Sequence, residues 1–460
     1  MDLMHSEMTT VAAVSTPYGR GGIAVIRISG PDAVAIAEKL FVPGGGYMLS
    51  DAETNRMVWG HIYYKEESID DGMAVVFRAP HSYTGEDTVE ISCHGGIYLT
   101  QKVLESVFLC GAVPAGPGEF TKRAFLNGKL GLSQAEAIID LIDAKSMEGV
   151  RLAGAGARGM LKRAADEIYV LLRDAVSSTY AFIDFPDEDL TDLSDDRLLS
   201  GLEDIRAEVQ ALVCSYKTGR AVMEGIPTAI VGKPNTGKSS LLNLLLKRDR
   251  AIVSPVAGTT RDTIEETALL GSVTLRLADT AGIHDTADHV ERIGIDRSLE
   301  KLKEAELVLA VFDLSRPFDG EDRALVEKLG EKDCPVIALQ NKCDLPRAFL
   351  EELPPQFIKI EMSAKDGLPQ ELEKTVERLF EADRLDYRDG AILTCARQAA
   401  AAGKALSLLD SAIEALKMGV TRDVAALDAE LAMAEIAEID GRAVGEDIVS
   451  AIFSRFCVGK

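Results

Sequence analysis

The sequence predicts a multidomain protein with an α+β domain at the N-terminus, an all-α helical domain, and an α/β module inserted into the helical domain. Three observations support this. Short apolar runs alternate with helical patterns from about residue 9 to 120. Helical periodicity dominates on both sides of a second α/β stretch, which begins near residue 226. That stretch opens with a glycine-rich phosphate-binding pattern between an apolar run and a helical one.

The length and periodicity together set the expected domain boundaries. At 460 residues the chain is too long for one hydrophobic core. We expect an N-terminal α+β domain over 1–120, a first helical part over 121–218, the inserted module over 219–383, and a second helical part over 384–460.

Composition narrows the class of protein. The net charge of −24 excludes a protein that coats duplex nucleic acid over its whole surface, although a local basic groove stays open. The seven cysteines form no CxxC pair, so we expect reduced thiols and no zinc site. No apolar run approaches the roughly 20 residues of a membrane span, and the N-terminus lacks a secretory pattern. We therefore expect a cytoplasmic protein that has no membrane partner.

The N-terminal domain is expected to contain short strands and two helices. The strands are predicted over 11–14, 23–28, 58–63, 73–77 and 89–92, and the helices over 33–40 and 99–109. Three turn clusters, at 19–22, 83–87 and 94–96, carry polar and glycine residues.

Helical periodicity takes over after the turn at 114–118. Helices are expected over 120–127, 133–145, a long Ala/Leu/Arg-rich stretch to Ile183, 198–217, 391–418 and 424–456. Between two of them, Asp184 to Asp196 holds seven carboxylates and no cation, which predicts a solvated loop. An inserted module would let nucleotide-driven movement act on the helices at both its ends.

The phosphate-binding pattern runs from Gly232 to Ser239. Its glycines let backbone N–H groups face phosphate oxygens at a helix N-terminus. Lys238 is expected to supply charge to the outer phosphates, and the Ser239 hydroxyl to bind Mg²⁺. The strand before it and the helix after it are the context that this motif requires.

Four further segments follow in the order typical of GTPases. They are Gly258–Thr260, Asp279–Gly282, Asn341–Asp344 and Ser363–Lys365, the last three directly after predicted strands. Loops at the carboxyl ends of parallel strands converge on one ligand. The Asp344 carboxylate can accept two N–H groups from guanine, which adenine does not present, so GTP is the expected nucleotide. Ser239 and Thr260 would hold Mg²⁺, with Asp279 nearby.

One position departs from the Ras-like pattern. Ile283 stands where Ras-type enzymes place a glutamine that orients water, and its side chain cannot do so. Another group must take that role. The residues alone leave Asp285, Asp288 and Glu291 as candidates.

The motifs together resemble the MnmE (TrmE) family of tRNA-modifying GTPases. They are Gly19-Arg20-Gly21-Gly22, Ile26-Arg27-Ile28-Ser29-Gly30, His94-Gly95-Gly96, the segment from Gly118 to Lys129, the inserted GTPase module, and the terminal Phe456-Cys457-Val458-Gly459-Lys460. The resemblance covers essentially the whole chain.

The resemblance implies a reaction. With a flavin-carrying partner, MnmG (GidA), family members add an aminomethyl or carboxymethylaminomethyl group to C5 of the wobble uridine of certain tRNAs. A tetrahydrofolate derivative, 5-formyl- or 5,10-methylene-tetrahydrofolate, supplies the one-carbon unit at a homodimer interface. By motif position, Arg27, Glu86, Lys129 and Lys460 would contact this folate.

The resemblance also implies roles in GTP hydrolysis. Family members use K⁺ in place of an arginine finger, and the matching positions are Asn235, Ser254, Val256 and Thr259. Glu291 matches the family's water-orienting residue, whereas His284 departs from the usual cation. With Lys238 and Cys457, Glu291 completes the predicted catalytic set. The predicted GTP contacts are Gly232, Asn235, Thr236, Gly237, Lys238, Ser239, Ser240, Ser254, Thr259, Thr260, Asp279, Thr280, Ala281, Gly282, Asn341, Lys342, Asp344, Ser363, Ala364 and Lys365.

A second class of protein shares the same module. Regulatory or ribosome-assembly GTPases only switch between nucleotide-bound states. They lack the N-terminal domain and the tail at 456–460, and these two features favour the modification enzyme.

Overall fold

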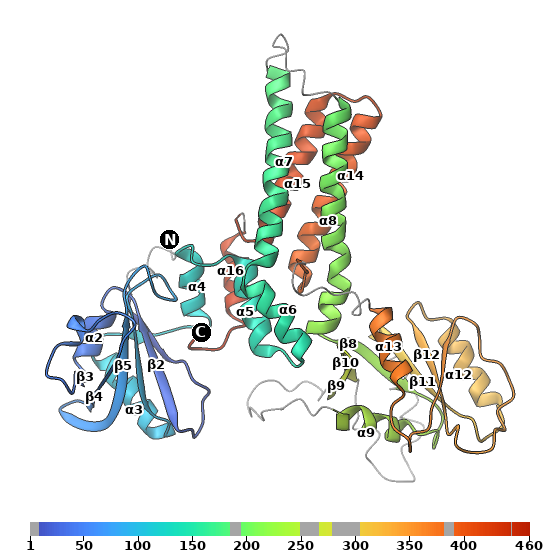
Figure 1. Ribbon diagram of the computed structural model, residues 1–460, viewed down its shortest axis with the longest axis horizontal. Coiled ribbons are helices and arrows are strands. Elements are labelled where there is room, and N and C mark those ends of the chain that lie inside the picture. The colour runs from blue at the N-terminus through green and yellow to red at the C-terminus, as the bar shows by residue number, and fades with distance from the viewer. Residues whose placement is uncertain (1–8, 185–194, 249–265, 278–303, 381–390, 443) are drawn as a thin grey trace. The chain divides into compact units, whose positions relative to one another are not determined.

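The computed structural model describes residues 9–184, 195–248, 266–277, 304–380, 391–442 and 444–460 (Figure 1). The chain divides into two compact units. The first comprises Met1–Ile139 and Asp440–Lys460, and the second comprises Asp140–Ile439. The acidic segment expected to form a solvated loop lies mostly outside the described residues.

The first unit is an α+β fold, as predicted for the N-terminal part of the chain. Its elements are β1 (Val11–Val14), β2 (Ile23–Ser29), α2 (Ala33–Glu38), β3 (Phe41–Pro43), η1 (Leu49–Asp51), β4 (Met57–Tyr64), β5 (Glu67–Phe77), β6 (Thr88–His94), α3 (Ile97–Leu109), β7 (Val113–Pro114), α4 (Glu119–Leu126), most of α5 (Leu132–Asp143) and α16 (Glu446–Phe453).

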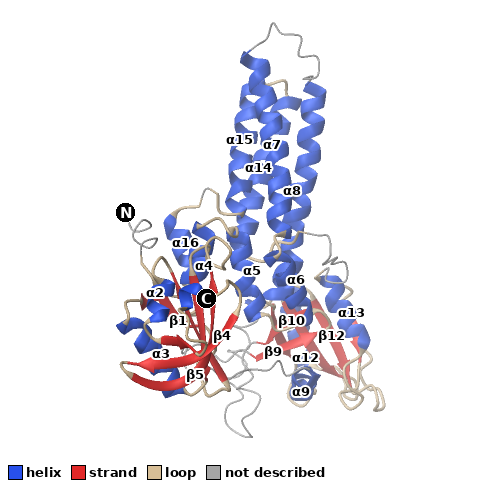
Figure 2. Ribbon diagram, turned by 60° about the vertical axis from the view of Figure 1, so that its left-hand side comes forward, coloured by secondary structure: helices blue, strands red, loops and turns tan. Residues whose placement is uncertain are grey.

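A seven-stranded sheet in the order β3-β4-β5-β6-β2-β1-β7 organises this unit (Figure 2). Neighbouring strands are antiparallel except for β1 and β7, which are parallel. Every second residue of β2, namely Ala24, Ile26 and Ile28, is buried, because alternate side chains of a strand point to one face. Residues of α2 and α3 share that core.

The chain returns to the first unit after residue 439. Helix α16 packs on α4 and α5 through Phe453 and Phe456, which join a core with Leu132. The rings of Phe453 and Phe456 stack with centroids 5.3 Å apart. The backbone N of Leu132 donates to the carbonyl O of Asp440 at 3.1 Å. The last residues of the chain are thereby fixed against its first strands.

The second unit contains a helical bundle and a parallel sheet. Its elements are α6 (Met147–Ala157), α7 (Met160–Asp184), α8 (Asp195–Met223), β8 (Ile226–Val231), α9 (Lys238–Arg248), β9 (Glu266–Leu270), β10 (Val273–Leu277), β11 (Leu307–Asp313), α12 (Gly320–Gly330), β12 (Val336–Asn341), β13 (Ile358–Glu361), α13 (Gln370–Leu379), α14 (Ala396–Lys417) and α15 (Arg422–Ile439).

Helices α7, α8, α14 and α15 lie side by side and share one core, which draws on residues from both sides of the α/β stretch (Figures 1 and 2). Arg397 ties the end of α15 to the start of α14. Its guanidinium donates to the carbonyl oxygens of Glu438 at 2.7 Å and Ile439 at 2.9 Å, which a helix C-terminus leaves without partners. The helical domain with an inserted α/β module is therefore confirmed.

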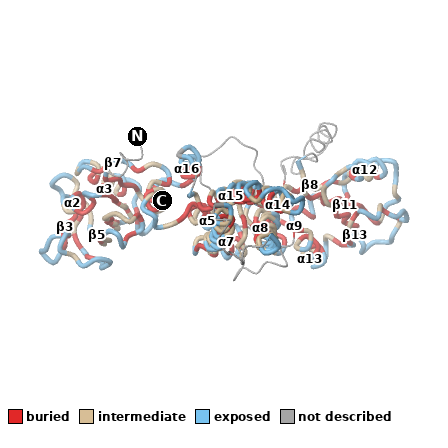
Figure 3. The backbone as a smooth tube through the Cα atoms, turned by 90° about the horizontal axis from the view of Figure 1, so that it is seen from above, coloured by how far each residue is buried: buried red, intermediate tan, exposed pale blue. Residues whose placement is uncertain are grey.

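The sheet of the second unit has six strands in the order β13-β12-β11-β8-β10-β9. All pairs are parallel except β9 with β10. Every residue of β11 and β12 is buried, as expected for parallel strands covered on both faces, and Figure 3 shows the chain around β11 largely in the buried colour. Separate cores lie against α9 and α13 and against α12.

Two expected helices are each broken in the structure. The stretch to Ile183 divides into α6 and α7 at Gly159, whose φ of +82° a helix cannot continue. The helix expected over 424–456 is α15 and α16, and Gly441 with φ of +85° lies between them. Strands β3, β7 and β9 were not predicted, because short edge strands carry little periodic signal. The central strand β11 was not predicted either.

Two further findings concern the described helices and the cysteines. Within the described ranges, none of the helices combines the length and apolar character required to traverse a bilayer. All seven cysteines lie in described segments, and none forms a disulfide.

Candidate functional sites

The phosphate loop connects β8 to α9 and depends on two glycines. Gly232 has φ of +151° and Gly237 has φ of +107°, both in the region that side chains rarely adopt. A Cβ at Gly232 would collide with the carbonyl O of Val311, and one at Gly237 with Nδ2 of Asn341. Asn235 also has a positive φ, +62°. The loop conformation therefore requires these residue types.

The side chain of Lys238 forms hydrogen bonds with the backbone of the loop. Its Nζ donates to the carbonyl O of Gly232 at 2.8 Å and of Lys233 at 2.6 Å. Burial lowers the pKa of this ammonium group below its usual value. An anionic phosphate would restore the favoured charged form, so the lysine is suited to an anion rather than to solvent. Ser239 is exposed at the first turn of α9.

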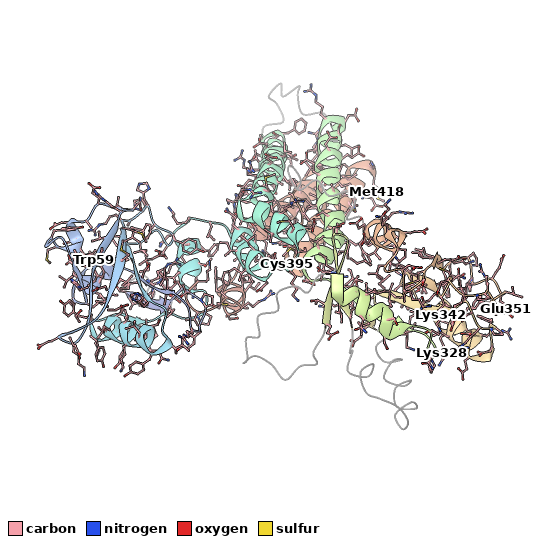
Figure 4. The ribbon with its side chains drawn as sticks, turned by 60° about the horizontal axis from the view of Figure 1, so that its bottom comes forward. Trp59, Lys328, Lys342, Glu351, Cys395 and Met418 are labelled. Atoms are coloured by element: carbon pink, nitrogen blue, oxygen red, sulfur yellow. The ribbon has the colours of Figure 1, made fainter. Side chains whose placement is uncertain are left out.

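Asn341 ties three predicted segments together at the carboxyl ends of the strands. Its Nδ2 donates to the carbonyl O of Thr236 at 2.7 Å, and its Oδ1 accepts from the backbone N of Ala364 at 3.0 Å. Lys342, labelled in Figure 4, donates to the carbonyl O of Asn235 at 2.9 Å. The phosphate loop and the segments at 341–344 and 363–365 are thus brought to one place.

Asp344 lies at the exposed end of this group. Its carboxylate pairs with Lys365 at 2.9 Å. The hydrogen bond from Lys365 lowers the pKa of Asp344, and the same bond raises the pKa of Lys365. The carboxylate is therefore ionised across the neutral range, as an acceptor for guanine N–H groups must be.

Part of the predicted nucleotide site falls outside the described residues. This holds for Ser254, Val256, Thr259, Thr260, Asp279, Thr280, Ala281, Gly282 and Glu291, and for the alternatives His284, Asp285 and Asp288.

A second group of predicted residues lies in the first unit, around α4. Arg27 pairs with Glu90 at 2.7 Å, and its guanidinium lies over the rings of Tyr83 at 5.4 Å and Phe120 at 5.3 Å. Such stacking leaves the edge of a guanidinium free to donate. Burial raises the pKa of Tyr83, whose hydroxyl bonds Thr121 at 2.9 Å.

Glu86 and Lys129 belong to the same group of predicted residues. The Glu86 carboxylate accepts from Ser29 at 2.8 Å and from Arg123 at 3.1 Å. Arg123, only 3% exposed, also pairs with Glu119 at 3.2 Å. Nζ of Lys129 donates to the carbonyl O of Pro80 at 2.8 Å. Glu86 is thus paired with a buried cation.

The C-terminal tail completes this group. Backbone N of Phe120 donates to the carbonyl O of Lys460 at 3.1 Å, and backbone N of Gly118 donates to that of Cys457 at 3.3 Å. The hydroxyl of Ser15 donates to the carbonyl O of Gly459 at 3.0 Å. Cys457 itself is exposed. Arg27, over the ring, and Lys460, at the backbone N, therefore both contact Phe120.

Sequence reasoning missed several residues that hold these groups in place. Asp313 ends β11 and binds Nζ of Lys342 at 2.6 Å. Although burial acts to raise its pKa, hydrogen bonds from Lys342 and Ser315 lower it overall. In the first unit, Arg123 supports Glu86. A charged residue on the apolar face of a predicted helix was the available signal for Arg123, whereas Asp313 had none beyond its place at a strand end.

The fold and the nucleotide site define a P-loop GTPase. This class is defined by a parallel sheet with one antiparallel edge strand, a glycine-dependent phosphate loop at a helix start, and an ionised aspartate on the adjoining loop.

Family comparisons agree. A family model described as GTP-binding protein TrmE N-terminus matches residues 10–129, and one described as MnmE helical domain matches residues 132–457. The chain belongs to the MnmE family.

Curated relatives match along the whole chain. The tRNA modification GTPase MnmE of Geobacter sulfurreducens is 40% identical, covering 98% of this chain and 99% of the relative. That of Moorella thermoacetica is 43% identical, with coverage of 98% and 99%. A solved structure of Era in complex with MgGDPNP and a segment of 16S ribosomal RNA is 25% identical, with a TM-score of 0.24 and coverage of 39% of this chain and 65% of that one.

Proposed function

We propose that this protein is a tRNA modification enzyme that couples GTP hydrolysis to a one-carbon transfer. With a flavin-carrying MnmG (GidA) partner, it adds an aminomethyl or carboxymethylaminomethyl group to C5 of the wobble uridine of certain tRNAs. The observation that carries this proposal is the tail: exposed Cys457 is fixed beside Gly118, in the same unit as Arg27 and Glu86. A GTPase that only switches has no need of this arrangement.

In the nucleotide site, the contacts support roles for Lys238 and Asp344, and the motifs supply the others. Backbone N–H groups of the loop and Lys238 would hold the phosphates, and Ser239 with Thr260 would hold Mg²⁺. Asp344 would accept from the guanine edge, with Lys365 keeping it ionised. Glu291 would orient the attacking water in place of the missing glutamine.

A monovalent cation would assist hydrolysis. K⁺ held by Asn235, Ser254, Val256 and Thr259 would neutralise charge that develops between the phosphates. Asn235 is exposed in the phosphate loop and has a positive φ. Hydrolysis should be faster in KCl than in NaCl at equal ionic strength, and equal rates would remove K⁺ from the scheme.

The residues of the first unit fit a tetrahydrofolate derivative by the chemistry of their donors. The Glu86 carboxylate would accept from a pterin N–H edge, and it retains acceptor capacity beyond the bonds from Ser29 and Arg123. Exposed Lys129, with Lys460, would meet the carboxylates of the glutamate tail. Arg27 would hold the ring region. When bound, the folate supplies the one-carbon unit; 5-formyl- or 5,10-methylene-tetrahydrofolate would both serve.

The partners follow from the same proposal. The protein would act as a homodimer, in a hetero-oligomer with the flavin-carrying partner, and on tRNA in the cytoplasm. The net charge of −24 means that tRNA must be bound by a local cationic surface or by the partner.

The decisive experiment replaces Cys457 by Ser and analyses tRNA by mass spectrometry in cells that carry only the variant. We expect wobble uridines to lose the modification while purified protein hydrolyses GTP at the normal rate. Cys214→Ser is the matched control, because Cys214 is also exposed but lies on α8 of the bundle. Normal modification with Cys457→Ser would refute the role of the tail. If tRNA is modified normally with both variants and GTPase activity is also normal, a regulatory or ribosome-assembly GTPase would be favoured.

A further inference from the structure

An ionic cluster beside the phosphate loop has no role in the scheme above. Lys233 directly follows Gly232, and its Nζ lies 2.7 Å from Oδ2 of Asp319 and 2.7 Å from Oδ2 of Asp322. The Lys233 side chain is 16% exposed and that of Asp322 is 7% exposed. A lysine so enclosed, with two carboxylates at hydrogen-bonding distance, is held in one geometry.

The two carboxylates are themselves fixed at the start of α12. Oδ1 of Asp319 accepts from the backbone N of Glu321 at 3.0 Å and of Asp322 at 3.3 Å. In return, Oδ2 of Asp322 accepts from the backbone N of Asp319 at 3.2 Å. This reciprocal arrangement is a capping box, which stabilises the first turn of a helix. Lys233 is therefore attached to a rigid point of the fold.

The backbone of the same lysine organises the loop. Its carbonyl O accepts from Nζ of Lys238 at 2.6 Å and from Oγ1 of Thr236 at 2.9 Å. One residue thus connects α12, through its side chain, to the lysine that faces the phosphates, through its carbonyl. A shift of Lys233 would move the acceptor on which Lys238 rests.

Charge gives Lys233 a second effect. Asp319 and Asp322 place two negative charges next to a loop that binds an anion, and Lys233 is the cation that contacts both. Without it, their charges would act against the phosphates.

We propose that Lys233 is a positioning residue, which clamps the phosphate loop to α12 and cancels the charge of two carboxylates beside the nucleotide site. The proposal depends on the proposed role of this loop as the phosphate site for GTP. It assigns Lys233 to nucleotide retention and not to the chemical step, because its ammonium group contacts α12.

The test measures the affinity and dissociation rate of fluorescent GDP and GTP analogues for the full-length Lys233→Met variant. We expect about tenfold weaker binding, or about 1.4 kcal/mol, mainly through faster dissociation. The kcat at saturating GTP should stay within about twofold of the original, while KM rises. Lys233→Arg should retain most of the affinity because it can still bridge both carboxylates.

Lys328→Met is the matched control. Lys328 lies in the last turn of the same helix, is exposed, and is labelled in Figure 4. We expect it to leave nucleotide affinity unchanged. Equal losses in the two lysine variants would overturn the proposal, as would an unchanged affinity in Lys233→Met.

A combined variant separates the two effects of Lys233. Adding Asp319→Asn and Asp322→Asn to Lys233→Met removes the uncompensated charge but leaves the clamp broken, and asparagine still offers an oxygen to cap α12. We expect about threefold recovery of affinity. A purely structural role would instead lower the melting temperature of nucleotide-free protein with no change in affinity, which would refute the proposal.

Two outcomes separate this proposal from the function on which it depends. If Lys233→Met does not fold, Asp319→Asn alone, which loosens one side of the clamp, should weaken GDP binding about threefold, and no change would overturn the proposal. If the unaltered protein binds no guanine nucleotide, the proposed function fails and this proposal fails with it. If the unaltered protein binds guanine nucleotide normally and the variants have the same affinity, only the proposal for Lys233 fails.

Discussion

The nucleotide site and the N-terminal site are constructed in opposite ways. In the nucleotide site, three loops leave one parallel sheet at the same edge, and Asn341 joins them through the backbones of Thr236 and Ala364. In the N-terminal site, residues as distant in sequence as Arg27 and Lys460 meet around Phe120. Ion pairs such as Arg123 with Glu86 hold this second group together.

The difference teaches which changes each site can tolerate. A site defined by backbone geometry should fail when a Cβ is added, whatever the charge. A site defined by charge balance across distant segments should fail when one ion loses its partner. Four experiments test this contrast.

The largest expected effect is in the N-terminal site. Arg123→Met leaves the carboxylates of Glu86 and Glu119 without their cation in a largely buried position. We expect the first unit to lose about 3–5 kcal/mol of unfolding free energy. Denaturant unfolding, followed by a probe in the first unit such as the fluorescence of Trp59, measures this. Arg56→Met, which breaks an exposed pair with Glu53, should leave the unfolding free energy nearly unchanged. Comparable costs would contradict the contrast.

The second-largest effect is expected in the nucleotide site, which depends on backbone geometry. Gly237→Ala places a Cβ against Asn341 at a φ of +107°. We expect about hundredfold weaker GTP binding, or about 2.7 kcal/mol, with little change in the stability of the first unit. Gly403→Ala is the control, because this glycine lies within α14 with no atom near its absent Cβ. Fluorescence titration with a GTP analogue gives both values, and retained affinity in Gly237→Ala would break the comparison.

A side chain within the backbone-defined site should have a smaller effect. Asp344→Asn removes a charged acceptor for guanine, so GTP affinity should fall about tenfold. Xanthosine triphosphate should bind the variant better than GTP does, because an amide can donate to its carbonyl oxygen. Competition titration checks both expectations. Asp333→Asn, on the exposed loop before β12, should change neither affinity.

The smallest effect concerns two cysteines of the first unit. Burial raises the pKa of the Cys93 thiol to about 11, and the charge of Asp70 adds to this. Cys93 should resist alkylation at pH 8, whereas exposed Cys457 should react, and mass spectrometry of peptides distinguishes them. The folded state favours the neutral thiol of Cys93, which stabilises the fold below the ordinary pKa of a thiol. This stabilisation should be lost as the pH rises from that ordinary pKa toward about 11. Rapid labelling of Cys93 in folded protein would contradict its burial.

The fold was predictable where periodicity is long. The helices of the bundle and strands such as the one predicted over 336–339 follow from long apolar patterns, and β12 is fully buried. The central strand β11 was not predicted, although all its residues are buried. Helix ends were less predictable, because the breaks at Gly159 and Gly441 depend on single left-handed residues. Short edge strands such as β3 were missed for lack of a repeating pattern.

The two sites were predictable to different degrees, because one is defined by local backbone geometry and the other by ion pairs between distant segments. The residues of the nucleotide site occur in contiguous motifs whose spacing reflects a local backbone shape. Arg27, Glu86 and Lys460 came only from the family resemblance, since no spacing links segments so far apart. Their partners Arg123 and Phe120 came from neither source, because ion pairs and ring contacts form between segments that only the fold brings together.

The bond between Leu132 and Asp440 has a consequence for protein engineering. The bundle and the nucleotide module together form a single cassette, whose removal leaves Ile139 and Asp440 as the ends to be joined. Ile139 lies seven residues beyond Leu132 along α5, so the gap is about 10 Å at 1.5 Å per residue. A linker of about four residues would span it. Simple truncation after residue 139 would instead discard Phe453 and Phe456 and uncover the apolar surface on which they pack.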